Sequence, residues 1–396
     1  MKSRDLLCLL QLICTLAIVN SVYASDDSQR IVVNGGTTTC PGAQFSRIQD
    51  AINAASPGQT IEVCAGLYNE TLQIANSLSL KLDSGALLMP TSISQSTVSL
   101  ASGNPIAAII TVRNAAEVNI EGGVIDAGAS GISQCAPNLM GIVYQNSSGT
   151  VKRTWVRNTQ LVSRLSGCQS GDGIFIQSGN GGTSRVTVTE NRVEGYQKNG
   201  ITANEVGTQV EISLNIVVGA GPTTGAAQNG IQIGFGAQGS IEQNFVTGNI
   251  WSPCSSPDQC VFLATGILIE QSDNITIEDN SVGNNQVNIF LRGDGIKVRK
   301  NNRLFGSVVL DNIQVAGNSA EIESNQIYNS ARAAVGVSGN DARIRKNIIT
   351  NAQIGILKSA NVSSIDIGKN DYDDVDILFV DPSPVLTTPG TTHPER

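Results

Sequence analysis

The residues of this chain best suited to chemistry lie two and four positions after the Gly of a repeated Gly-Ile pair, which once reads Asn-Ile. Strand alternation points the side chains at these two positions toward the same face. Amides, a few charges and occasional aromatic rings on one face suit the recognition of sugar hydroxyls and sugar rings. The candidate binding residues at these positions are Gln145, Phe175, Gln177, Asn204, Gln232, Glu270 and Arg292.

An ordinary solvated strand face is the alternative interpretation of this row. Polar alternation is normal for a strand with one face in water. Glu270 and Arg292 are expected on adjacent turns, where an exposed ion pair would contribute little free energy.

One acid, Asp172, directly precedes a Gly-Ile pair and is a further candidate. Inverting glycoside hydrolysis needs two carboxylates with room for a water between them. Gly171 occupies the place where a partner acid would stand, and Asp-Gly-Ile recurs at 294–296, so the repeat alone can generate this motif.

Metal and imidazole chemistry has little support in the sequence. The single histidine is His393, near the C-terminal end, and the methionines are Met1, Met89 and Met140. This inventory argues against a histidine acid or base and against a copper site. An acidic cluster could offer oxygen ligands to Ca²⁺, but it lacks a defined loop spacing, and a solvated edge that deters strand pairing is favoured. The cluster consists of Asp366, Asp371, Asp373, Asp374 and Asp376. No cofactor is expected.

A second repeat predicts the elements that position these side chains. It consists of an apolar residue, two variable residues, Asn or Gly, one variable residue and another apolar residue, as in Val188-x-x-Asn191-x-Val193 and Ile120-x-x-Gly123-x-Ile125. Copies this short cannot bury their own apolar face and must stack. Apolar residues alternate at the strand period, the Asn or Gly tolerates left-handed backbone and turns the chain, and buried Asn can bond to the Asn of the next turn. The sequence therefore predicts an all-β parallel β-helix of about 11 to 12 turns.

Composition places this solenoid outside the cell. Residues 1–24 have the charged start, apolar core and small-residue end of a secretory signal, and no other apolar run approaches that length. Residues 25–380 form the expected β-helix domain, and the Pro- and Thr-rich residues 381–396 are expected to be disordered. We expect a secreted protein, or a periplasmic one if the source is bacterial. No membrane association is expected after removal of the signal.

The cysteines support export. Loss of Cys8 and Cys14 with the signal would leave an even number of cysteines, as expected for disulfides in an exported chain. Sequence order favours three pairs, although fifteen connectivities exist for six cysteines. The pairs are Cys40–Cys64, Cys135–Cys168 and Cys254–Cys260. Four Asn-x-Ser/Thr sequons matter only if the source glycosylates its proteins.

The net charge of −8 and the absence of a basic run argue against nucleic-acid binding. An acidic chain also disfavours a strongly polyanionic substrate, unless a local basic groove overrides the overall charge.

The chain resembles the right-handed parallel β-helix proteins of the pectin-lyase-like superfamily over roughly residues 31–380. The most specific stretch runs from Phe45 to Glu70. In the family this stretch is a capping helix that leads into the first coil. Within residues 45–55, apolar side chains recur at helical spacing. Ser46 and Gln49 have capping-box spacing, and Ser56-Pro57-Gly58 is expected to stop the helix.

No complete catalytic set of the family is present. The segment 170–174 resembles the acidic segment of polygalacturonase-like hydrolases but retains only Asp172. Gly66-Leu67-Tyr68-Asn69-Glu70 fits a pectin methylesterase motif, yet Tyr68 falls on a repeat position that predicts a core role. A lyase would need an Arg or Lys base, and no basic residue stands in a recognisable lyase motif.

The resemblance implies an exported β-helix that binds extracellular or cell-surface polysaccharide, with modification of that polysaccharide as a second expectation. This inference rests on fold-level analogy. The alternatives are a non-catalytic structural or adhesive solenoid and a polysaccharide lyase with an unidentified base.

Overall fold

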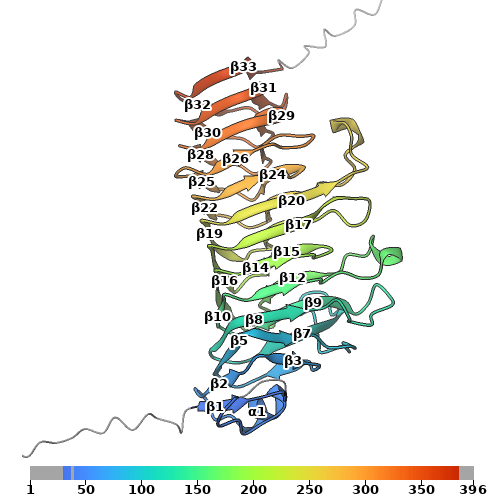
Figure 1. The fold of residues 1–396 in the computed structure, drawn as a ribbon. Coiled ribbons are helices and arrows are strands. Elements are labelled where there is room, and N and C mark those ends of the chain that lie inside the picture. Colours follow the sequence, from blue (N-terminus) through green and yellow to red (C-terminus); the bar gives the residue numbers. More distant parts are fainter. Residues whose placement is uncertain (1–29, 37–39, 383–396) are drawn as a thin grey trace, which may run out of the picture.

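The computed structural model describes residues 30–36 and 40–382. The expected signal segment, His393 and all but two residues of the expected tail lie outside these ranges. The chain winds into coils that stack along one axis from β1 (Arg30–Val33) to β33 (Asp371–Val380) (Figure 1). Among the described strands, all pairings are parallel except that of β6 (Thr97–Val98) with β7 (Pro105–Arg113). The predicted all-β parallel β-helix is confirmed.

Three series of strands run up the solenoid, and each strand pairs with its counterpart in the next coil. The first series is β1, β2 (Thr60–Val63), β5 (Leu78–Leu88), β8 (Val118–Asp126), β10 (Gly149–Lys152), β13 (Ser184–Thr189), β16 (Thr208–Ser213), β19 (Gln238–Glu242), β22 (Thr276–Glu278), β25 (Lys297–Arg299), β28 (Glu321–Glu323), β30 (Ala342–Arg345) and β32 (Ile365–Ile367). The second series is β3 (Gly66–Tyr68), the ends of β5 and β8, β11 (Trp155–Arg157), β14 (Arg192–Glu194), β17 (Ile216–Thr223), β20 (Phe245–Trp251), β23 (Ser281–Gly283), β26 (Arg303–Phe305), β29 (Gln326–Val337), β31 (Ile348–Lys358) and β33.

The third series carries the Gly-Ile pairs. It consists of β4 (Leu72–Ile74), β7, β9 (Asn138–Gln145), β12 (Asp172–Gln177), β15 (Asn199–Asn204), β18 (Asn229–Gly234), β21 (Thr265–Glu270), β24 (Val287–Arg292), β27 (Ile313–Val315) and the ends of β29, β31 and β33. The number of strands in this series agrees with the predicted number of turns. Ile and Val of all three series point inward and form one continuous core along the axis.

The Asn positions of the repeat form a ladder of side-chain hydrogen bonds inside the solenoid. Each amide donates to the Asn side-chain oxygen of the next coil, at 2.9–3.1 Å. The ladder comprises Asn191, Asn215, Asn244, Asn280, Asn302, Asn325, Asn347 and Asn370. Because buried amides are costly unless paired, this ladder fixes the corner between the first and second strand series.

The left-handed backbone at this corner lies one residue earlier than the sequence predicts. Glu190, Leu214 and Gln243, which each precede a ladder Asn, have φ values of 57°, 58° and 56°. The Asn is instead held by its side-chain bonds, so residues of several types tolerate the left-handed position before it.

The N-terminal end of the core is covered by α1 (Ile48–Ala54), which buries Ile48, Ala51 and Ile52 against the first coil. The predicted capping box is wrong, since the N-cap is Arg47 and makes no side-chain cap bond. Glu70 of the next coil accepts hydrogen bonds from the backbone N–H groups of Ile48 and Gln49, at 2.8 and 3.1 Å. A carboxylate at a helix N-terminus satisfies the free N–H groups there, which explains the arrangement.

Tyr68 has the predicted core role. It is 3% exposed, and its hydroxyl donates to the Cys64 carbonyl oxygen at 2.8 Å. All three predicted disulfides, Cys40–Cys64, Cys135–Cys168 and Cys254–Cys260, are present.

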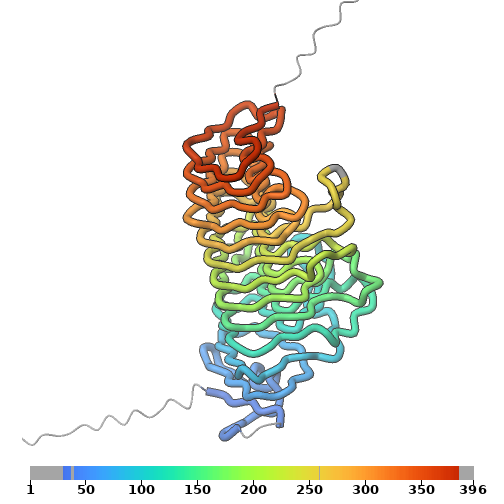
Figure 2. The backbone as a smooth tube through the Cα atoms, turned by 45° about the horizontal axis from the view of Figure 1, so that its top comes forward, coloured from blue at the N-terminus to red at the C-terminus, as the bar shows by residue number. Residues whose placement is uncertain are grey.

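The connections between the second and third strand series are the longest loops of several coils, and they project from one side of the solenoid (Figures 1 and 2). They include 127–137, 158–171 with the short helix η2 (Ser163–Leu165), and 252–264 with η3 (Pro257–Gln259).

Candidate functional site

The predicted rows of the third strand series are in register. Phe175 pairs with Thr202, and Thr202 pairs with Gln232. Gln145 pairs with Gln177, and Gln177 pairs with Asn204. Stacking therefore aligns these residues as the sequence predicts.

The N-terminal part of this face is covered, so two candidates do not lie on an open surface. Gln145 and Gln177 are each 1% exposed. The Gln145 amide donates to the Val98 carbonyl oxygen at 2.7 Å, and the Gln177 amide donates to the Ser99 hydroxyl at 3.1 Å. Their amides hold the β6 segment onto the sheet, so neither side chain faces open solvent.

Two further candidates are buried within the same face. Phe175 is 6% exposed and packs in a separate apolar cluster with Met140 and Val143, so it offers no open ring for stacking. Gln232 is 7% exposed, and its amide donates to the Asn204 side-chain oxygen at 3.1 Å. The face is open only farther along, where Asn204 and Glu270 are partly exposed and Arg292 is exposed.

Glu270 and Arg292 form the predicted ion pair between adjacent coils, at 2.8 Å from Nη1 to Oε2. The Arg292 guanidinium also lies 5.9 Å from the Phe290 ring centroid. Both charges are therefore partnered within the protein.

Asp172 lies at the first position of β12 and is 8% exposed. One of its carboxylate oxygens accepts the Asn199 backbone N–H at 3.1 Å. Burial raises the pKa of Asp172 to about 7, although the nearby Lys198 charge and the Asn199 hydrogen bond lower it. Lys198 donates to the Ala227 carbonyl oxygen at 2.9 Å, and burial lowers its pKa. The charged group that shifts the Asp172 pKa is the Lys198 ammonium and not a second carboxylate.

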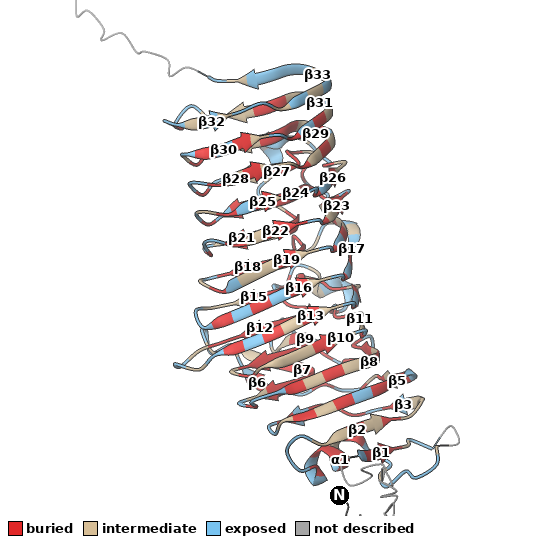
Figure 3. Ribbon diagram, turned by 90° about the vertical axis from the view of Figure 1, so that its left-hand side faces the viewer, coloured by how far each residue is buried: buried red, intermediate tan, exposed pale blue. Residues whose placement is uncertain are grey.

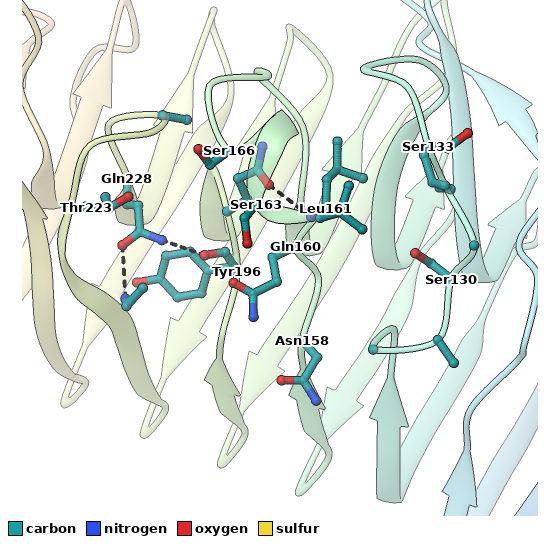
Figure 4. Close-up of a pocket in the computed structure, with 18 of the residues that line it drawn as sticks. Ser130, Ser133, Asn158, Gln160, Leu161, Ser163, Ser166, Tyr196, Thr223 and Gln228 are labelled. Atoms are coloured by element: carbon teal, nitrogen blue, oxygen red, sulfur yellow. Dashed lines mark hydrogen bonds between the residues drawn. The ribbon is translucent and has the colours of Figure 1, made fainter.

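A cleft of about 910 Å³ lies between the projecting loops (Figure 4). This volume is at the upper end of the range of about 300–1,000 Å³ for ligand pockets. Asn158, Gln160 and Ser163 lie between Ser130 and Ser133 on one side and Thr223 on the other. The cleft adjoins the starts of β12, β15 and β18, because its loops lead directly into these strands.

Buried amides beneath the cleft hold its loops in place. The Gln197 side-chain oxygen accepts the Leu161 N–H at 2.9 Å, and its amide donates to the Leu165 and Cys168 carbonyl oxygens at 2.8 and 2.9 Å. Gln228 binds the Ala220 N–H and the Tyr196 carbonyl oxygen in the same manner. The disulfide Cys135–Cys168 ties two of the loops together. The cleft is therefore built on a fixed framework.

The side chains that face the opening retain free hydrogen-bonding groups. Gln160, Ser163 and Thr224 are exposed, and their side chains make no hydrogen bond within the described part of the chain. Amides and hydroxyls of this kind both donate and accept. The described lining contains no Asp, Glu, Lys, Arg or His.

Asp126 bonds to two residues of the cleft lining and is fully partnered. It is 4% exposed, accepts the Gly128 N–H at 2.8 Å and the Asn158 amide at 2.9 Å, and pairs with Arg157 at 2.6 Å. Burial raises its pKa, but these hydrogen bonds and the Arg157 charge together hold the pKa below its ordinary value.

None of the eight candidate residues lines the cleft. The residues that do, such as Gln160 and Ser163, lie in loops without the repeat, where periodicity gives no signal. The sequence signal that could have found them is the disulfide Cys135–Cys168, which joins the two segments that interrupt the repeat.

Comparison with solved structures settles the fold type. A lacto-N-biosidase of family GH136 from Eubacterium ramulus superimposes with a TM-score of 0.62 at 12% identity, over 89% of this chain and 68% of that protein. A family 28 exopolygalacturonase from Yersinia enterocolitica gives 0.54 at 12% identity, over 89% and 77%. The chain has the right-handed parallel β-helix fold of the pectin-lyase-like type. At this identity the likeness concerns the fold alone.

The family model described as periplasmic copper-binding protein (NosD) matches residues 254–383, less than half of the chain. No curated protein matches the sequence. None of the helices in the described part is long and apolar enough to cross a membrane.

The residues of the NosD-like segment do not fit a copper site. Copper favours imidazole, thiolate and thioether ligands. Residues 254–383 contain no His and no Met, and their two cysteines, Cys254 and Cys260, are bonded to each other. Within the described ranges, no three His, Cys, Asp or Glu side chains come together as a metal site would require, and this includes the acidic cluster considered for Ca²⁺.

Proposed function

We propose that this exported β-helix protein binds a polysaccharide, outside the cell or on a cell surface, in the cleft between its projecting loops. The observation that carries the proposal is the cleft itself: about 910 Å³, held by a disulfide and buried amides, with unpaired amide and hydroxyl groups at its opening. Such groups match the hydroxyls of a sugar chain, which both donate and accept hydrogen bonds.

Export is supported by two observations. Three disulfides occur in one chain, which is typical of an oxidising compartment. The partly matching family model is described as periplasmic.

The names of the structurally similar proteins agree with a saccharide ligand without establishing one. One is named a lacto-N-biosidase and the other an exopolygalacturonase. Because folds of this kind host many activities, the proposal rests on the cleft and not on these names.

The test is a glycan array followed by calorimetric titration of the oligosaccharides that bind. Gln160→Ala removes an amide at the opening of the cleft and should weaken binding about 5- to 30-fold, the effect of one lost hydrogen-bonding group. Gln169→Ala is the matched control, since Gln169 is exposed on the same loop but does not line the cleft. Equal affinity of both variants and the wild type would reject the cleft as the site.

The same titrations separate binding from the alternatives. Release of unsaturated or shortened products from a bound polymer, followed by absorbance and chromatography, would show that the protein also modifies its ligand. Absence of binding to every glycan would favour a structural or adhesive solenoid.

A further inference from the structure

The side chains that line the cleft are uncharged over its entire described surface. The polar ones are serine, threonine, asparagine and glutamine, together with the buried Tyr196. From this we infer that the ligand is a neutral glycan and not a uronate, sulfated or otherwise anionic chain. The inference rests on the proposed function and specifies its substrate class.

Charge pairing is the physical reason. A polyuronate carries one negative charge on each sugar, and removing that charge from water is costly unless a cation or several hydrogen bonds replace the lost solvation. Proteins that bind carboxylates or sulfates supply Arg or Lys for charge-assisted hydrogen bonds. The opening of this cleft supplies Gln160, Ser163 and Thr224 instead, which bind neutral hydroxyls and acetamido groups equally well.

The charged residues that adjoin the cleft lining in sequence are paired with each other. Arg157 pairs with Asp126 at 2.6 Å, and its guanidinium lies 4.4 Å from the Trp155 ring centroid. Asp126 is 4% exposed and has its hydrogen bonds satisfied by Gly128 and Asn158. The opposite charges of Asp126 and Arg157 neutralise each other.

Arg164 is the exposed cation nearest in sequence to the lining residues. It does not line the cleft, and both of its terminal nitrogens donate to the Ser133 carbonyl oxygen, at 3.3 and 3.4 Å. A single guanidinium engaged with backbone could meet one anionic group and not a chain of them.

The adjoining strand face leads to the same conclusion. Arg292 pairs with Glu270 at 2.8 Å, Arg332 pairs with the buried Asp311, and Lys198 lies beside Asp172. A ligand that extends from the cleft along this face would therefore meet cations that already have carboxylate neighbours.

The experiment compares neutral and anionic glycans at low and high ionic strength. The probes are galactan, arabinan and N-acetylhexosamine oligosaccharides against polygalacturonate, alginate and a sulfated galactan, titrated into the full protein. Neutral probes should bind, with a Kd that changes less than about twofold between the two salt concentrations, because no charge is screened. Arg164→Gln should leave this binding within about twofold, since its contact is to backbone.

A gain-of-function variant makes the test independent of finding the best glycan. Gln160→Lys places a cation at the opening and should create salt-sensitive affinity for polygalacturonate, whereas Gln169→Lys outside the cleft should not. Salt-sensitive binding of uronate polymers by the wild type, lost in Gln160→Ala, would overturn the inference while leaving the proposed function in place. Failure of every probe to bind would overturn both.

Discussion

The two ends of the solenoid protect the same kind of exposed core by different means. At the N-terminal end, α1 lies over the first coil, Ile48 is fully buried, and the disulfide Cys40–Cys64 joins the chain before the helix to the strand after it. At the C-terminal end no described element covers β33, where Ile377 is 47% and Phe379 is 39% exposed (Figure 3).

At the C-terminal end, negatively charged side chains take the place of a covering element. Asp371, Asp373, Asp374 and Asp376 are exposed on β33 and form no ion pair within the described residues. An uncovered strand edge invites pairing with another chain, and unpaired like charges discourage that pairing. The N-terminal end is therefore covered by packing, which stabilises the fold. At the C-terminal end, repulsion between the Asp side chains and another strand edge discourages association without stabilising the fold.

The largest expected effect on the free energy of unfolding comes from removing an Asn in the middle of the ladder, compared with removing the last Asn of the ladder. Asn280 donates to the Ile241 and Glu278 carbonyl oxygens and to Asn302, and its side-chain oxygen accepts the Asn244 N–H. Asn280→Leu should lower the free energy of unfolding by about 3–6 kcal/mol, because it leaves several buried polar groups without partners. Asn370→Leu, in the final coil, should cost less than half as much, since Asn370 is itself partly exposed to water.

Thermal and urea unfolding of the two variants measures this difference. Equal losses would mean that the ladder is no more important inside the solenoid than at its end. Binding of the glycan should be unaffected by Asn280→Leu, because the ladder lies on a different corner from the cleft.

The second comparison tests packing at the two ends directly. Ile48→Ala in α1 should destabilise the protein by about 2–4 kcal/mol, the usual cost of removing a buried aliphatic side chain. Ile377→Ala in β33 should cost less than about 1 kcal/mol, since nearly half of the side chain is already in water. Urea unfolding curves give both values, and a similar cost at the two positions would show that the C-terminal end is covered in solution.

The third prediction concerns the carboxylate that caps α1. Glu70→Ala should lower stability by about 1–2 kcal/mol, because two backbone N–H groups at Ile48 and Gln49 lose their acceptor. Glu70→Gln keeps one acceptor oxygen and should lose less. Melting temperatures of the two variants provide the measurement, and an unchanged value for Glu70→Ala would reject the cap.

The smallest effect on stability is expected for the acidic edge. The double variant Asp373→Asn/Asp376→Asn should change the free energy of unfolding by less than about 0.5 kcal/mol, as is usual for exposed positions. It should increase self-association, which light scattering coupled to gel filtration would detect, because repulsion between edges is reduced. Glu211→Gln on β16 is the matched control, and association of both variants to the same extent would contradict a specific role for β33.

The repeat made most of the fold predictable from sequence. Inward Ile and Val, the ladder Asn residues and the core Tyr68 occupy places that the period alone assigns. The repeat did not predict Asn302 as a ladder residue, because it lies one residue too far from Val298. Asn302 nevertheless forms hydrogen bonds in the ladder. Glu70 could not be recognised as the cap of α1, since it belongs to the next coil and its role arises only on stacking.

The site was less predictable than the scaffold. Comparing the Gly-Ile repeats of this chain with one another predicted the correct register of the strands. It could not reveal that the β6 segment covers Gln145 and Gln177. Gln160 and Thr224 are distant in the sequence and carry no periodic signal. They line the same cleft because stacking brings the loops of nearby coils to one side of the solenoid, which is a property of the stack and not of any single copy.

The disulfides have a consequence for how the protein is made. The cysteines of each pair are 24, 33 and 6 residues apart, so each bond joins neighbours along the chain. No pair encloses a cysteine of another pair. If the chain enters an oxidising compartment from its N-terminal end, each cysteine would meet its correct partner before the next pair arrives. Order of emergence alone can select the native connectivity among the fifteen that six cysteines allow, which would lessen the need for an isomerase.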